Sequence, residues 1–152
     1  MIIFLDIDGV LKTDWNKVKW NNNCISILNK IYHNIPNIEY VITSTWRITR
    51  TVKELQDILI SNGIVGNIKG FTPVLCEDRG IEISEYIKQN DISNFIVIDD
   101  KIEDIIDYID NDKIYCCDFI KGLTSSIGDS IIRKFIWENV KNEIVVIYFI
   151  MK

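Results

Sequence analysis

The sequence predicts an α/β fold, a three-layer Rossmann-like sandwich around a mainly parallel central sheet. Short apolar runs typical of buried strands alternate with segments in which apolar residues recur at helical spacing. The chain has 152 residues, of which 47 % are hydrophobic, and this is enough for one sizeable core. We therefore expect residues 1–152 to form a single domain.

The first half of the chain is predicted to contain two strands, each followed by a helix, and a further extended segment. Pro36 ends the first helix because it lacks an N–H group, and Gly63 is a suitable stop for the second. In order, the elements are a strand at Ile2–Ile7, a loop from Asp8 to about Asn22, a helix with Cys24, Ile27, Leu28, Ile31 and Ile35 on its apolar face, a strand at Ile38–Thr43, a helix carrying Val52, Leu55 and Leu59, and an extended segment near Asn67–Val74.

The second half continues the alternation. Its elements are a helix at Gly80–Gln89, a strand at Phe95–Asp99, a short helix at about Ile102–Ile109, a strand at Lys113–Cys117 and a helix at Ser126–Asn139. The apolar tail, residues 143–152, is predicted as an extra edge strand. So apolar an edge needs a cover, which makes this C-terminal segment a candidate contact for an oligomer.

Composition and charge exclude several classes of protein. A charged fraction of 26 % with 11 % aromatic residues is typical of a globular chain, not a disordered one. The run Ile144–Met151 is shorter than the roughly 20 residues that span a membrane, and the N-terminus lacks a signal-peptide pattern, so we expect a cytoplasmic protein. A net charge of −5 argues against nucleic-acid binding through a broad basic surface, but not against a local basic groove.

Carboxylates and hydroxyls follow three of the predicted strands, at the sheet edge where open α/β folds bind ligands. These groups lie in Asp6-Ile7-Asp8-Gly9-Val10, in Thr43-Ser44-Thr45-Trp46-Arg47, and in Asp99-Asp100 with Asp104 four residues later. Gly9 suits a turn that re-aims Asp8. Carboxylates 4 Å apart at a protein surface repel by about 4 kcal/mol, so a cation is expected among them. Oxygen ligands without a Cys/His set favour Mg²⁺.

This order of motifs resembles the haloacid dehalogenase (HAD) superfamily of phosphatases, whose first motif is Asp-x-Asp-Gly-Val/Thr at the end of the first strand. The match is Asp6-Ile7-Asp8-Gly9-Val10. The resemblance covers about residues 1–125. More narrowly, further motifs are similar to those of small HAD domains associated with nucleic-acid repair: Thr43–Arg47, Arg79–Ile83, Asp99–Asp100 and Gly122–Thr124.

The resemblance implies a role for each matched residue. Asp6 would be the nucleophile that forms an aspartyl-phosphate, and Asp8 the general acid and base. Thr43 would bind a phosphoryl oxygen, although the sequence does not separate it from Ser44. Arg79 would be the cation that neutralises the phosphoryl group.

Two assignments stay open at this point. The superfamily more often has lysine as its third-motif cation, so Lys101 is a rival to Arg79. The magnesium ligands would be the Ile7 carbonyl and several carboxylates, foremost Asp100 and Asp6, with Asp8 and Asp99 as further candidates and Asp104 in support.

Each motif alone also has a structural interpretation. Asp-x-Asp-Gly is a common turn, Asp99-Asp100 and Thr43–Thr45 could cap helices, and Arg79 could be an ordinary surface charge. The order and location of the motifs together favour catalysis.

The intervals between the motifs predict a capless HAD core with an open site. Neither Lys12–Asn37 nor Ile48–Asp78 has room for a cap domain, and an open site suits bulky substrates. The loop Lys12–Trp20 interleaves three lysines with two tryptophans, which could stack bases and hold phosphates or could pack on the core.

The sequence therefore predicts a magnesium-dependent phosphomonoesterase that acts through an aspartyl-phosphate, with a polynucleotide end, in particular a 3′-phosphate, as the favoured substrate. One alternative is a phosphatase of nucleotides, sugars or phosphoproteins. Another is a catalytically silent phosphate-binding module, although such a module should have lost Asp6 or Asp8.

Overall fold

A computed structural model of the chain describes residues 1–14 and 19–150, with the backbone alone for 142–150. Its centre is a five-stranded sheet in the order β3-β2-β1-β4-β5, and every pairing is parallel. The strands are β1 (Ile2–Leu5), β2 (Glu39–Ile42), β3 (Asn67–Phe71), β4 (Phe95–Asp99) and β5 (Ile114–Cys116). The predicted Rossmann-like α/β architecture is confirmed.

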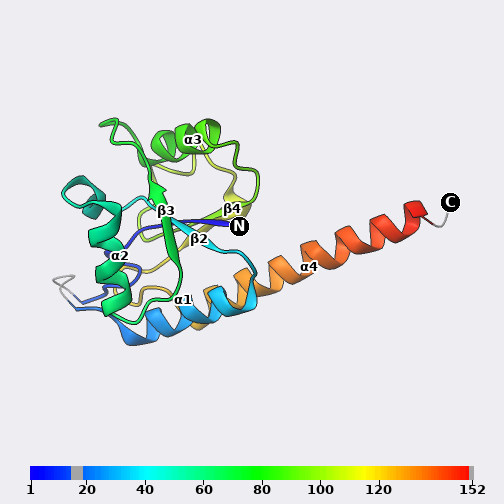
Figure 1. Cartoon of the computed structure of the whole chain (residues 1–152), viewed down its shortest axis with the longest axis horizontal. Helices are drawn as coiled ribbons and strands as arrows, with labels where there is room; N and C mark the ends of the chain where they lie inside the picture. Colours follow the sequence, from blue (N-terminus) through cyan, green and yellow to red (C-terminus); the bar gives the residue numbers. More distant parts are fainter. Residues whose placement is uncertain (15–18, 151–152) are drawn as a thin grey trace.

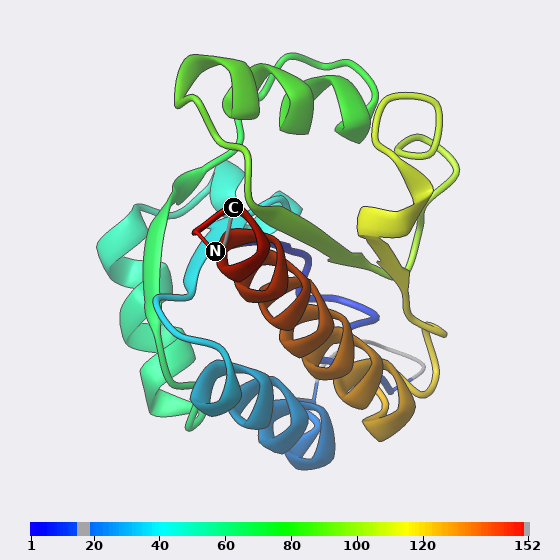
Figure 2. The same ribbon diagram turned by 90° about the vertical axis from the view of Figure 1, so that its right-hand side faces the viewer.

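Helices cover both faces of this sheet. In Figures 1 and 2, α3 lies on one face, and α1 and α4 lie side by side on the other. The helices are α1 (Asn22–Asn34), α2 (Val52–Ser61), α3 (Arg79–Gln89) and α4 (Ser125–Ile150), with short 3₁₀ segments η1 (Thr45–Ile48) and η2 (Asn111–Lys113). Apart from residues 15–18, the two intervals between motifs are filled by core elements, as expected for a capless core.

The central strand β1 shows why the strand sequences are continuously apolar and do not alternate between apolar and polar residues. Successive side chains of a strand point to opposite faces. Ile3 and Leu5 pack in the core that includes α1, α2 and α4, whereas Ile2 and Phe4 pack toward α3. Both faces are thus buried, which is typical of parallel sheets.

The order of the strands places a ligand crevice at the end of β1. The chain passes from β1 to β2 on one side and later returns to β4 on the other, so the connections that follow β1 and β4 diverge. Such a switch point opens a crevice at the carboxyl ends of the strands.

The ends of α2 agree with the sequence signals. A Thr51–Glu54 capping box starts the helix, and Gly63 follows its end with a φ of 81°.

The prediction of an edge strand at residues 143–152 is wrong for the described part of the tail. Helix α4 continues without a break to Ile150 and projects beyond the sheet (Figure 1). The sequence has no Gly or Pro between Asn139 and Ile150 to end it. A helix also satisfies its own backbone hydrogen bonds, whereas a strand needs a partner edge. No helix in the described part of the chain is long and apolar enough to span a membrane.

The proposed oligomer contact through this C-terminal segment stays a prediction. Exposed apolar side chains lie on α4 just before the tail, at Ile136, Trp137 and Val140.

The predicted helix at Ile102–Ile109 is also wrong, because this segment forms consecutive turns. The Ile102 carbonyl accepts hydrogen bonds from the N–H groups of both Ile105 and Ile106. Asp and β-branched residues, which dominate the segment, have low helix propensity. Burial of Ile105 and Ile109 holds the turns against α3 instead.

Candidate active site

The register of the sheet brings three predicted site residues into one row. Leu5 pairs with Ile42 on one side and with Ile98 on the other. The residues that follow, Asp6, Thr43 and Asp99, therefore lie side by side, and all three are buried. Residues that stand 37 and 93 positions from Asp6 in the sequence thus meet it at one edge.

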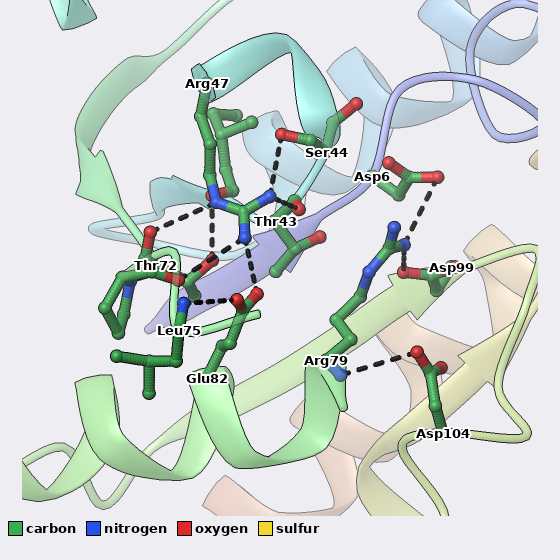
Figure 3. A network of polar contacts seen from close by, with 12 residues as sticks. Asp6, Thr43, Ser44, Arg47, Thr72, Leu75, Arg79, Glu82, Asp99 and Asp104 are labelled. Carbon is green, nitrogen blue, oxygen red and sulfur yellow. Dashed lines mark hydrogen bonds and ion pairs between the residues drawn. The ribbon is translucent and has the colours of Figure 1, made fainter. Parts of the chain in front are cut away.

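Helix α3 supplies the cation of this row. Arg79 is the first residue of α3, and its Nη1 lies 2.5 Å from Asp99 Oδ2 and 3.5 Å from Asp6 Oδ2 (Figure 3). The turn after β4 fixes this helix start, because the Gly80 N–H donates to the Asp104 carbonyl (2.9 Å). A Cβ on Gly80 would approach that carbonyl to 2.9 Å, so only glycine allows the close contact.

Burial and charge set the protonation of this cluster. Burial raises the pKa of Asp6, while the Arg79 charge opposes that shift. Burial, together with the negative charge of Asp6, raises the pKa of Asp99 to about 7. Burial works against the charge on Arg79, yet the carboxylates of Asp99 and Asp6 raise the pKa of Arg79 above its ordinary value. Arg79 therefore stays charged, and a further positive charge nearby would stabilise the ionised form of the carboxylates around it.

The acidic cluster has the composition of a magnesium site. Asp6, Asp99 and Asp100 each offer a carboxylate oxygen, and these oxygens lie within 4.8 Å of one another. Gly9, with a φ of 89°, makes room for Asp100, since a Cβ there would come within 2.2 Å of the Asp100 carboxylate. Three oxygen ligands in one place fit Mg²⁺, a hard cation that shares its shell with water and phosphate. Asp8 does not belong to this group.

An open cavity of about 220 Å³ lies over the cluster and contains most of the predicted site residues. Asp8 lies in its wall, where its Oδ2 accepts a hydrogen bond from the Trp46 indole N–H at 2.9 Å. The lining residues are Asp6, Asp8, Ser44, Thr45, Arg79, Asp100 and Lys101.

Thr43 and Ser44, which the sequence does not separate, occupy different positions. The Ser44 side chain lines the cavity and hydrogen-bonds Asp6, which lowers the pKa of that carboxyl against the effect of burial. Thr43 is fully buried, and its Oγ1 has no hydrogen-bond partner among the described residues. Of these two residues, Ser44 is thus the one whose side chain can meet a ligand in the cavity.

The two candidate cations also differ in position. Arg79 touches both Asp6 and Asp99, whereas Lys101 is exposed and contacts Asp99 only through its backbone N–H, which donates to Oδ1 at 2.9 Å. Asp104 supports α3 rather than the carboxylate cluster, because its Oδ2 accepts from the Arg79 backbone N–H at 3.4 Å.

Sequence reasoning missed two contacts beside the site. The hydrogen bond from Trp46 to Asp8 is one. The other is the buried ion pair of Arg47 and Glu82, which carries no local sequence signal because 35 residues separate its partners. Of the Lys12–Trp20 loop, residues 15–18 lie outside the described residues, and Trp20 packs edge-on to Trp46. The proposed stacking of bases on this loop stays a prediction.

Comparison with known proteins agrees with this geometry. A family model described as "HAD domain in Swiss Army Knife RNA repair proteins" matches residues 2–126. The matched region contains the whole sheet and ends at the start of α4. Searches of curated proteins and of solved structures gave no match.

Proposed function

The chain belongs to the family of HAD domains of Swiss Army Knife RNA repair proteins, and from this premise we propose that it is a magnesium-dependent phosphomonoesterase. Its substrate would be a polynucleotide end, in particular a 3′-phosphate. The observation that carries the proposal is the bridge from Arg79 to Asp6 and Asp99 at the carboxyl edge of the sheet. The bridge supports the proposal because it holds Asp6 and a cation together with the acidic cluster beside one open cavity.

Asp6 is the nucleophile in this proposal. One of its carboxylate oxygens attacks phosphorus, a bond from Asp6 to phosphorus forms, and the bond to the leaving oxygen breaks. Arg79 neutralises charge shared by Asp6 and the phosphoryl oxygens, and its guanidinium has more donors than its two carboxylate contacts require. Ser44 lines the cavity, and its single hydroxyl donor can turn from Asp6 to a phosphoryl oxygen when substrate binds.

Asp8 transfers protons in both halves of the reaction. It gives a proton to the leaving oxygen as the phosphorus–oxygen bond breaks. It then takes a proton from water, which attacks the aspartyl-phosphate and releases inorganic phosphate and Asp6. Its position in the cavity wall suits both transfers.

The metal site of the proposal consists of Asp6, Asp99 and Asp100. Bound Mg²⁺ would supply positive charge for the phosphoryl group and these carboxylates. The raised pKa of Asp99, about 7, supports this choice, because a buried carboxylate that loses its proton needs a nearby cation.

The test is phosphate release with and without Mg²⁺ from four substrates: a 3′-phosphorylated oligonucleotide, a 5′-phosphorylated oligonucleotide, a nucleoside monophosphate and a phosphopeptide. We expect turnover of one oligonucleotide end, dependent on Mg²⁺ and abolished in Asp6→Asn. Asp57→Asn, which changes an exposed aspartate on α2, is the matched control and should keep full activity.

Other outcomes would discard separate parts of the proposal. Turnover of the small ester or the peptide alone would discard the polynucleotide substrate. Turnover that persists in Asp6→Asn would discard the nucleophile. A chain that releases no phosphate from any substrate would favour the silent binding module.

A further inference from the structure

We propose that Trp46 is a positioning residue, which holds the Asp8 carboxyl group in one orientation for proton transfer to the leaving oxygen. The inference deepens the proposed function and depends on it for the role of Asp8. It assigns a task to a side chain that the motif resemblance leaves without one.

The hydrogen bond defines which Asp8 oxygen is available. The Trp46 indole N–H donates to Asp8 Oδ2 at 2.9 Å. An indole N–H donates but cannot accept, so it engages a lone pair of Oδ2 and opposes rotation of the carboxyl group. Oδ1 is then the oxygen left to carry the proton that Asp8 transfers.

The ring of Trp46 is itself held by cations. Lys12 Nζ lies 4.6 Å and Arg50 Cζ 4.4 Å from its ring centroid, and the ring of Trp20 meets it edge-on at 5.8 Å. Positive charges attract the electron-rich face of an indole. Polarisation of the ring by such charges strengthens its N–H as a donor, as in other chains of polar contacts.

Lys12 ties this arrangement to the loop that carries Asp8. Its side chain is buried, and its backbone carbonyl accepts from the Gly9 N–H at 2.8 Å. Asp8 and one of the cations over Trp46 therefore belong to the same tight loop after β1. Because cations already lie over its ring, Trp46 is better suited to orient Asp8 than to stack a base.

The proton matters most for a poor leaving group. When the phosphorus–oxygen bond to a sugar breaks, the leaving alkoxide needs the proton of Asp8 as it departs. A p-nitrophenolate is stable as an anion and departs without one. Loss of the orientation of Asp8 should therefore slow release of the sugar oxygen far more than release of p-nitrophenolate.

The experiment compares Trp46→Phe with wild type in single-turnover release of the leaving group. The two substrates are a 3′-phosphorylated oligonucleotide and p-nitrophenyl phosphate. We expect the maximal single-turnover rate for the oligonucleotide to fall roughly 10- to 100-fold with an unchanged half-saturating concentration, because the hydrogen bond stabilises the negative charge that develops on Asp8 as its proton leaves. The aryl rate should change less than about threefold. Asp8→Asn should show the same selectivity with a larger loss.

Trp137→Phe is the matched control, because it changes an exposed indole on α4 and leaves the Trp46–Asp8 hydrogen bond in place. It should leave the ratio of the two rates unchanged. Equal losses for both substrates in Trp46→Phe, alongside selective loss in Asp8→Asn, would overturn the inference and leave the proposed function standing. A wild-type chain inert to both substrates would contradict the proposed function and the inference with it.

A second variant removes only the donor, in case Trp46→Phe fails to fold. Incorporation of 3-benzothienylalanine at position 46 keeps the bicyclic shape and replaces the N–H by sulfur. The same selective loss is expected, and an unchanged ratio of rates would overturn the inference.

Discussion

Two arginines, Arg47 buried and Arg79 half-buried, lie beside the same sheet edge and have different surroundings (Figure 3). Each lies 2.5 Å from a carboxylate oxygen, Arg47 from Glu82 and Arg79 from Asp99. The Arg47 guanidinium also donates to four backbone carbonyls, so its hydrogen-bonding capacity is met by the protein. These carbonyls belong to Thr43, Ser44, Thr72 and Pro73.

Arg79, by contrast, contacts the carboxylates of Asp99 and Asp6 and lines the open cavity. Its side chain is 20 % exposed against 5 % for Arg47. Burial lowers the pKa of Arg47, although Glu82 opposes the shift, whereas the two aspartates raise that of Arg79 in spite of burial. Arg47, whose donors are all bonded within the protein, fixes the loop after β2. Arg79, which faces carboxylates in the open cavity, is available to a phosphoryl group.

The largest expected effect comes from breaking the structural pair. Arg47→Met should lower the free energy of unfolding by about 3–5 kcal/mol, because it leaves the Glu82 carboxylate buried without its partner. Turnover per folded molecule should fall less than in Arg79→Ala, because Arg47 holds the backbone of Thr43 and Ser44 but faces no reacting group. Urea denaturation followed by fluorescence, with phosphate release measured on the folded fraction, checks both parts.

The double variant Arg47→Met/Glu82→Gln sharpens this test. Glutamine keeps an acceptor for the Leu75 N–H, which Glu82 Oε1 binds at 2.9 Å, and removes the stranded charge. It should regain part of the lost stability, though not the part due to the four unpaired carbonyls. A loss below about 1 kcal/mol in the single variant would mean that the pair is replaceable.

The second effect belongs to the other arginine and should fall on activity. Arg79→Ala should lower kcat about 10²- to 10³-fold, the usual loss for a donor that stabilises charge in a transition state. Arg79→Lys should recover part of this loss, because it restores the charge without the planar fork. If kcat stays unchanged while the urea midpoint falls, Arg79 has a structural role like that of Arg47, and the proposed contrast between the two arginines is wrong.

A smaller effect, on the affinity for Mg²⁺, is expected at Gly9, where the lack of a side chain leaves room for the Asp100 carboxylate. Gly9→Ala forces the Asp100 carboxylate to move, since the new Cβ would lie 2.2 Å from it. We expect the apparent affinity for Mg²⁺ in the activity assay to fall about 10- to 100-fold, as for other changes that re-aim a metal ligand. Gly63→Ala is the control, because Gly63 also has a positive φ but has no atom within 4 Å of an added Cβ.

The sequence could predict the site where backbone register alone brings residues together. Asp6, Thr43 and Asp99 each follow a strand, and parallel pairing places the ends of neighbouring strands in one row. The Trp46–Asp8 contact could not be predicted, because it depends on how η1 turns the side chain. The Arg47–Glu82 pair depends on the packing of α3 against η1.

The tail shows the same limit in another form. Its apolar composition is compatible with a strand or a helix, and whether a strand there would pair with an edge of the sheet, β3 or β5, is not a local property of residues 143–150. Local patterns therefore predicted the strands and the residues at their ends, while contacts between side chains from different elements needed the structure.

The smallest effect is expected at Lys101, which the sequence left as a rival to Arg79. Lys101 lies at the cavity but is exposed, and water and salt screen exposed charges. Lys101→Met should therefore raise KM for an oligonucleotide at most about fivefold, with kcat unchanged, and the difference from wild type should shrink as salt is added. Its backbone N–H, which binds Asp99, stays in place in this variant. A fall in kcat as large as that of Arg79→Ala would instead make Lys101 the cation that acts on the phosphoryl group, and Arg79 would then join Arg47 as a structural arginine.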